Sequence, residues 1–338
     1  MSRAICKEFM EDLQTGCLSN LLKEVINDSS LIMELRGKSV IIYYRGGALF
    51  TILRNDDGSY SISYNPSYWR LKKKYEEIQE HPSIDECIKY IAYYKNQMDY
   101  HLTNAERNLE KQSQQRLVQE NNVLGGSLAK DPSDKKQTPT GDYFIIDTEY
   151  AYKSKEIDAR FDAVALKWPS LGSVRKNGNN LGIAFLELKY YDGSMSGASG
   201  IQKHISDFLK FTQSETYKAD YIDMCKDMTE VFRQKCRLGL IPAYTGRLDM
   251  TKEKYLDISI DPQKVEMIFM FANRDPDSIV APKELAKCIK EYGKEATQNI
   301  YVATSSDMGY VMFRYSEKGK TDKYIPICDY VKKYDGLL

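Results

Sequence analysis

Residues 181–190 read Leu-Gly-Ile-Ala-Phe-Leu-Glu-Leu-Lys-Tyr, an apolar run that predicts a buried β-strand ending in two opposite charges. Glu187 and Lys189 are two residues apart, so both side chains project from the same face of that strand. Taking both ions out of water costs several kcal/mol each unless hydrogen-bonding partners or a metal compensate. The pair therefore marks a candidate functional site.

A second carboxylate lies in an apolar stretch upstream. Residues 160–166 read Arg-Phe-Asp-Ala-Val-Ala-Leu and place Asp162 inside another predicted strand. If the two strands are neighbours, Asp162 and Glu187 repel each other unless a cation or a proton intervenes. Mg²⁺, or Mn²⁺ in its place, suits such a site because it takes oxygen ligands and keeps positions for water and a substrate phosphate.

The remaining residues of this constellation have roles that follow from position. Lys189 would lie beside a metal-bound water, where it would orient that water or stabilise charge on the phosphate. Asp147 and Glu149 lie on one face of the preceding strand, 143–150, and either acid could complete the metal shell.

Composition sets broad limits. A chain of 338 residues can hold two modest domains or one large one, and 42% hydrophobic with 28% charged residues is typical of a soluble globular protein. Lys plus Arg equals Asp plus Glu at 48 each, so no net field attracts the protein to nucleic acid or membrane, although a phosphate-handling enzyme stays possible.

Several functional classes lack their sequence signals. No apolar run reaches about 18 residues, and the N-terminus lacks the apolar core of a signal peptide. The seven cysteines form no C-x-x-C pair and only three histidines accompany them, so we expect reduced thiols in a cytoplasm rather than structural zinc. No Walker-type or G-x-G-x-x-G loop indicates nucleotide hydrolysis, and no nucleophile motif indicates Ser/His/Asp catalysis.

Periodicity predicts an N-terminal α+β accessory region over residues 1–124 and a second domain over 143–338. Residues 125–142 between them are rich in Gly, Ser, Asp, Pro and Lys, which is typical of a linker or mobile loop. The first region is predicted to contain helices at 3–27 and 83–122 and antiparallel strands at 39–44, 48–53 and 59–64. The second is predicted to contain strands at 143–150, 160–168, 181–190, 265–271, 300–303 and 310–315, and helices at 201–211, 219–237 and 282–292, which together indicate an α/β fold with a mixed sheet.

An Asp in one strand, a gap of about two dozen residues, Glu-x-Lys at the end of the next strand and then a helix resemble the PD-(D/E)XK, or restriction-endonuclease-like, nuclease superfamily. The resemblance covers roughly residues 143–315 and implies a mixed β-sheet core flanked by helices. It implies Asp162 and Glu187 as metal ligands and Lys189 as the catalytic lysine. It also implies Glu149, in preference to Asp147, as an additional acid, and Gln202 as the glutamine of the following helix.

The sequence departs from the family pattern in two places. Phe161 stands where a proline often precedes the Asp, and Ser206 stands where a tyrosine often follows the helical glutamine. His204 lies in the same helix, but the sequence alone gives it no role. These departures bear more on the subfamily than on the fold.

We therefore expect a cytoplasmic, metal-dependent phosphodiesterase (an endonuclease type of hydrolase) that cuts nucleic acid, DNA rather than RNA, and acts as a possible homodimer with no membrane. One alternative is a nucleic-acid-binding or protein-interaction module on the same fold that does not cut. Another is an interaction protein whose polar helix at 104–122 is the working surface. The simplest alternative makes Glu187 and Lys189 a surface ion pair on an edge strand, with Asp162 in a separate salt bridge.

Three smaller features have a functional and a plain interpretation. The basic stretches 70–74 and 175–178 are candidates to contact a nucleic-acid backbone, or are merely solvated segments. The glycine- and serine-rich turn 193–200 is placed to bring backbone N–H groups toward a phosphate at the start of the next helix.

Overall fold

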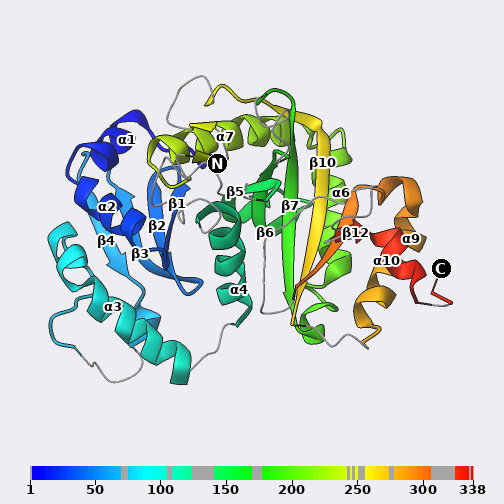
Figure 1. Ribbon diagram of the computed structural model, residues 1–338, viewed down its shortest axis with the longest axis horizontal. Coiled ribbons are helices and arrows are strands. Elements are labelled where there is room, and N and C mark those ends of the chain that lie inside the picture. Colours follow the sequence, from blue (N-terminus) through cyan, green and yellow to red (C-terminus); the bar gives the residue numbers. More distant parts are fainter. Residues whose placement is uncertain are drawn as a thin grey trace.

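Two main β-sheets organise the computed structural model, and the mixed α/β class predicted from the sequence is confirmed (Figure 1). A four-stranded sheet has the order β1-β2-β3-β4, and a six-stranded sheet has the order β12-β11-β10-β7-β6-β5. The residues described are 2–69, 75–104, 109–123, 141–169, 177–241, 244–245, 248–249, 256–273, 278–305, 324–334 and 336–337.

The four-stranded sheet is an antiparallel meander of β1 (Leu31–Arg36), β2 (Ser39–Tyr44), β3 (Gly47–Arg54) and β4 (Tyr60–Tyr64). Its last three strands agree with the prediction, whereas β1 was not predicted. The single helix predicted at 3–27 is wrong: the chain forms α1 (Lys7–Gln14) and α2 (Ser19–Asn27). The break falls at Gly16, where a Cβ atom would lie 2.4 Å from Asp12 Oδ1, so the chain turns too closely on α1 to continue the helix.

The long helix predicted at 83–122 is also divided. The structure has α3 (Ile84–Asn104), then α4 (Leu109–Val118) and a short π-helical turn, η2 (Gln119–Val123), with residues 105–108 outside the described part. The polar helix α4 is partly buried. It packs against β7, and Leu117 and Val118 are buried there with Leu186 and Leu188.

The six-stranded sheet contains the predicted strands with somewhat longer bounds. They are β5 (Tyr143–Lys153), β6 (Asp158–Lys167), β7 (Leu181–Tyr190), β10 (Ile260–Ala272) and β11 (Ile300–Ser305). At one edge β12 (Tyr324–Pro326) pairs with β11, and the strand predicted at 310–315 lies outside the described residues. Strand β7 is central, antiparallel to β6 and parallel to β10, which explains why its sequence is apolar on both faces.

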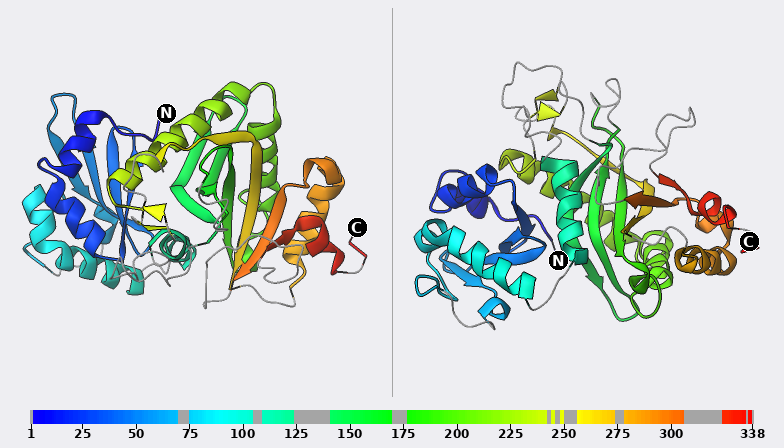
Figure 2. Two further views of the ribbon diagram at one scale, coloured as in Figure 1. Left: turned by 45° about the horizontal axis from the view of Figure 1, so that its top comes forward. Right: turned by 60° about the horizontal axis from the view of Figure 1, so that its bottom comes forward.

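Helices cover both faces of this sheet. Helices α6 (Ile201–Gln213) and α7 (Lys218–Arg237) pack on one face, and α4 packs on the other, between the two sheets (Figures 1 and 2). Helix α9 (Val280–Ala296) contacts α6 and the C-terminal α10 (Ile327–Lys332). Within the described residues, no helix is both long enough and apolar enough to cross a membrane.

Buried charges join the two sheets where their edge strands β1 and β5 meet. Arg36 of β1 forms an ion pair with Asp147 of β5 and donates a hydrogen bond to the Thr148 carbonyl at 2.6 Å. Glu34, also on β1, lies 2.7 Å from Lys235 Nζ of α7, and both residues are at most 2% exposed. The N-terminal region is therefore attached to the second sheet by ion pairs that water does not screen.

Candidate active site

The candidate site lies where β6 and β7 separate. Their pairing ends with Ala163 opposite Leu186, so the next residues outward are Asp162 and Glu187. Asp162 Oδ2 accepts a hydrogen bond from the Leu188 amide at 2.7 Å. The two carboxylates predicted to share a site are therefore brought together by strand register.

Glu187 is held by two cationic or potentially cationic side chains. Lys189 Nζ and His204 Nε2 each lie 2.8 Å from Glu187 Oε1. Glu187 and Lys189 are both 3% exposed and His204 is 9% exposed. The interpretation as a surface ion pair on an edge strand is wrong, because β7 lies inside the sheet and the pair is buried.

A backbone carbonyl in the turn before α6 completes this group. The Ser199 carbonyl accepts a hydrogen bond from Lys189 Nζ at 2.9 Å and lies 3.1 Å from His204 Nε2. The turn is tight, since a Cβ atom on Gly200 would lie 2.6 Å from the Ser196 carbonyl carbon. The glycine-rich segment 193–200 thus presents a carbonyl acceptor to the two side chains on Glu187.

His204 faces oxygen acceptors with both ring nitrogens. Nδ1 lies 3.2 Å from the Arg160 carbonyl oxygen, and Nε2 faces Glu187 and the Ser199 carbonyl. Carbonyl and carboxylate oxygens accept but do not donate, so each of these contacts needs an N–H on the ring. This arrangement fixes the ring and holds one oxygen of Glu187.

The electrostatics of the two carboxylates favour a cation. Burial, and then the charge of Glu187, raise the pKa of Asp162 well above its ordinary value, and the Leu188 amide and Lys189 only partly oppose this. Glu187 Oε2 is buried and accepts no hydrogen bond from the described residues. A divalent ion with oxygen ligands would supply the missing partner and relieve the repulsion, so the donor set fits Mg²⁺ or Mn²⁺.

Glu110, at the start of α4, is a third carboxylate that the sequence analysis missed. Burial raises its pKa; Lys189 lowers it, Glu187 raises it, and a hydrogen bond from the Tyr190 amide lowers it again. Glu110 in turn raises the pKa of Asp162. Its sequence context is a run of polar helix formers, and only the packing of α4 on β7 brings it to the site.

The three carboxylates do not form a ready-made cage. Among the residues that the structure describes, no group of three or more His, Cys, Asp and Glu side chains has the arrangement of a metal site. Mg²⁺ commonly uses only one or two protein carboxylates, with waters and substrate phosphates in its other positions. Asp162 and Glu187 match that number of protein carboxylates.

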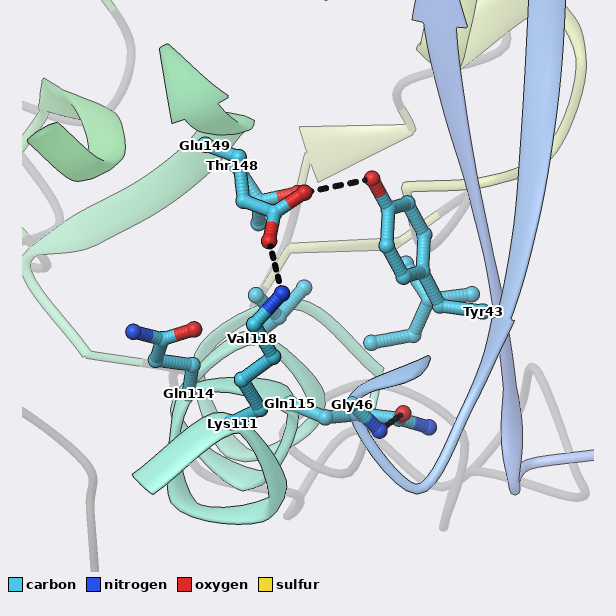
Figure 3. Close-up of a pocket in the computed structure, with 9 residues that line it drawn as sticks. Tyr43, Gly46, Lys111, Gln114, Gln115, Val118, Thr148 and Glu149 are labelled. Carbon is cyan, nitrogen blue, oxygen red and sulfur yellow. Dashed lines mark hydrogen bonds and ion pairs between the residues drawn. The ribbon is translucent and has the colours of Figure 1, made fainter. Parts of the chain in front are cut away.

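Glu149 lies close to the site along β5 but directs its carboxylate elsewhere. It falls between the residues paired with Ala163 and Phe161, next to Asp162 across the strands. Its backbone is left-handed, with φ 51°, and its carboxylate accepts hydrogen bonds from Tyr43 Oη and Lys111 Nζ, both at 2.9 Å (Figure 3). These partners line a pocket between β2, α4 and β5, so Glu149 connects the two sheets.

The other two predicted residues also have partners outside the site. Asp147 is fully buried in the ion pairs with Arg36 and Arg3. The Gln202 side-chain amide donates a hydrogen bond to Glu284 of α9. Two residues along α6 turn a side chain to the opposite side of the helix, which is why His204 rather than Gln202 contacts Glu187.

The basic residues 70–74 and 175–176, predicted as candidate contacts to a nucleic-acid backbone, lie outside the described residues, as does most of the linker at 125–142. Compared with known proteins, the chain matches no family model, and no curated protein or solved structure is significantly similar to it.

Proposed function

We propose that this chain is a metal-dependent nuclease of the PD-(D/E)XK superfamily that hydrolyses phosphodiester bonds of nucleic acid, DNA more readily than RNA. The observation that carries the proposal is the juxtaposition of Asp162 and Glu187 where the pairing of two neighbouring strands ends, with Lys189 hydrogen-bonded to Glu187. A buried charge cluster of this kind is costly to a fold that makes no use of it.

The proposed metal ligands are Asp162 and Glu187, with Glu110 as a third acid. We assign Glu110 this place instead of Glu149, because the carboxylate of Glu149 is bound by Lys111 and Tyr43. When bound, a divalent ion at such a site lowers the pKa of a coordinated water and stabilises charge on the phosphate.

The proposed roles of the other residues follow from their hydrogen bonds. An ammonium group has three N–H donors, and Glu187 and the Ser199 carbonyl accept two from Lys189. We assign the third donor to the attacking water or to a phosphate oxygen. His204 is a positioning residue, because it contacts Glu187 and not the reacting atoms.

The test is a cleavage assay with the purified full chain. Labelled single- and double-stranded DNA and RNA are incubated with Mg²⁺, Mn²⁺ or EDTA. We expect cleavage that requires the metal, and a loss of at least about 100-fold in Lys189→Ala, Asp162→Asn and Glu187→Gln, since each removes a group that acts in the transition state.

Lys167→Ala is the matched control. Lys167 is also a lysine of the six-stranded sheet in an ion pair with a buried glutamate, Glu266, but it lies near the opposite end of β6. This variant is expected to lose stability and keep its activity. No cleavage under any metal condition, or cleavage unaffected by Lys189→Ala, would contradict the proposal, and DNA that is bound but intact would indicate a non-catalytic binding module.

A further inference from the structure

Tyr191 has a backbone conformation that is unusual for a residue with a side chain. It directly follows β7, two residues after Lys189, with φ 62° and ψ 163°. This region of conformational space is essentially restricted to glycine, and other residues in it are strained. The chain nevertheless has a tyrosine here, one of the largest side chains.

The Tyr191 side chain is also exposed. It is 49% accessible to solvent, while its ring contacts Tyr190 edge to face with centroids 4.4 Å apart. The backbone is fixed, because the Tyr191 amide donates a hydrogen bond to the Ala272 carbonyl at 3.3 Å and the Tyr191 carbonyl accepts one from Ser194 Oγ at 3.0 Å. The ring therefore gains little burial in return for the strain.

Tyr191 is close to the candidate site along the chain. Two residues of chain span at most about 7 Å, so Tyr191 lies within the reach of one nucleotide from Lys189. The amide of Tyr190, its ring neighbour, is the group that hydrogen-bonds Glu110. An aromatic ring next to the proposed catalytic lysine has the chemistry that receives a nucleobase by stacking.

We propose that Tyr191 is a stacking platform for an unpaired nucleobase next to the phosphate that is cleaved. This inference rests on the proposed nuclease function and gives it a substrate class: single-stranded or locally unpaired nucleic acid. Stacking uses the face of any base, so the site selects for unpaired bases and not for their sequence.

The first test compares Tyr191→Gly with Tyr191→Phe. Glycine removes the ring and the strain together, so Tyr191→Gly is expected to raise Tm by about 2–4 °C while raising KM for single-stranded DNA about 10-fold or more. Tyr191→Phe retains the ring and should stay within about 2-fold of wild type. Asn180→Gly is the control, because Asn180 precedes the same strand at its other end with φ 55° and should change Tm without changing KM.

The second test measures binding instead of cleavage, and its comparison within the wild-type protein does not depend on how any variant folds. In EDTA, fluorescence anisotropy measures binding of a 12-nucleotide thymidylate and of an abasic chain with the same phosphates. We expect about 10-fold or tighter binding of the thymidylate, and no difference between the two chains in Tyr191→Gly.

Each other outcome overturns the inference. Unchanged KM in Tyr191→Gly, an equal loss in Tyr191→Phe, or equal binding of thymidylate and abasic chain in wild type would each remove the stacking role while metal-dependent cleavage still stands. Wild-type protein that neither binds nor cuts any nucleic acid would overturn both the stacking role and the proposed function.

Discussion

At the scale of single residues, the arrangement of the candidate site reduces the stability of the protein when no metal is bound. Asp162 is next to Glu187 with its pKa raised by burial and by that neighbour, and one oxygen of Glu187 is buried without a hydrogen-bond donor among the described residues. A site selected only for stability would pair or remove these oxygens. Under the proposed function, a bound cation would make the same features favourable.

The first prediction follows from Asp162. In EDTA at pH 7, Asp162→Asn should increase the free energy of unfolding by about 1–3 kcal/mol, because it removes a repelled carboxylate and keeps an acceptor for the Leu188 amide. A raised folded-state pKa means that the stabilising contribution is present below about pH 4 and is lost as pH rises through the folded pKa. Urea denaturation from pH 5 to pH 8 should therefore show the wild type losing stability relative to the variant. Asp158→Asn, on the exposed end of β6, is the control, and a less stable Asp162→Asn at pH 7 would contradict the argument.

Metal addition gives the second prediction. Saturating Mg²⁺ should raise the Tm of the wild type, with a stabilisation of about 2.7 kcal/mol at a concentration 100 times Kd. Asp162→Asn and Glu187→Gln should lose most of this shift, because each removes one of the charged oxygens assigned to the ion. Differential scanning fluorimetry with Mg²⁺ and with equal ionic strength of Na⁺ is the measurement, and an equal shift in all three proteins would rule out the site.

The third prediction separates two residues of one helix. His204→Ala should lower Mg²⁺ affinity and kcat/KM by about 10- to 100-fold, because His204 orients the proposed ligand Glu187. Gln202→Ala, whose wild-type amide contacts Glu284 on α9, should change both quantities less than about 3-fold. The comparison is made by Mg²⁺ titration as well as by kinetics. A general loss of folding would change the Mg²⁺ affinity and the cleavage rate together. Equal effects of the two substitutions would contradict the assignment.

At the scale of elements, α4 connects the N-terminal sheet to the candidate site. Its first turn carries Glu110, and the hairpin between β2 and β3 supports the same turn. A Cβ atom on Gly46 would lie 2.2 Å from the Lys111 carbonyl oxygen, so only glycine allows this approach. The position of one catalytic candidate therefore depends on a hairpin of the N-terminal sheet.

A fourth prediction tests that support. Gly46→Ala should destabilise the protein by about 1–3 kcal/mol and also reduce cleavage, because the added methyl group moves the turn that carries Glu110. Gly58→Ala is the matched control: its φ of 85° is equally unfavourable to alanine, but the nearest atom to its Cβ is the end of a flexible side chain, Arg54 Nη2, at 3.6 Å. Gly58→Ala should lose stability through its backbone conformation alone and keep full activity. Equal losses of activity in the two variants would contradict the argument that Gly46 affects cleavage through α4 and Glu110.

The elements that could be predicted from the sequence are those whose residue pattern reflects their burial directly. Strand β7 is buried on both faces and its bounds were predicted correctly, and Asp162, Glu187 and Lys189 were found because they interrupt apolar strands. Glu110 could not be found, because it stands in a polar helix and reaches the site only through tertiary packing. Glu149 was preferred to Asp147 on the family resemblance, whereas its left-handed backbone accompanies a carboxylate that is bound by Lys111 and Tyr43.

At the scale of the whole molecule, buried ion pairs connect the N-terminal region to the six-stranded sheet and to α7, which packs on it. Glu34 of β1 and Lys235 of α7 are far apart in the chain, buried, and 2.7 Å apart. Arg3, near the start of the chain, pairs with Asp147 of β5 at 3.2 Å. We expect a single cooperative unfolding transition and no separately stable fragment.

The fifth prediction concerns this connection. Lys235→Met should cost about 3–5 kcal/mol, because it leaves Glu34 buried without its nearest cation. The double variant Glu34→Leu/Lys235→Met should recover most of that loss, since no uncompensated charge remains. Lys226→Met breaks an exposed pair with Asp223 on the same helix and should cost less than about 1 kcal/mol. Urea denaturation of the four proteins is the measurement, and a double variant no better than Lys235→Met would contradict the reasoning.

The Ser199 carbonyl has a consequence for redesign. One peptide oxygen serves both the ammonium of Lys189 and the imidazole of His204, and the tight approach of Gly200 to Ser196 sets its direction. A redesign that changes the path of this turn would displace the hydrogen-bond acceptor of both Lys189 and His204. The turn and the helix after it should therefore be transferred together. The turn has more freedom at Gly193, which is exposed and where no atom lies within 4 Å of the position that a Cβ atom would take.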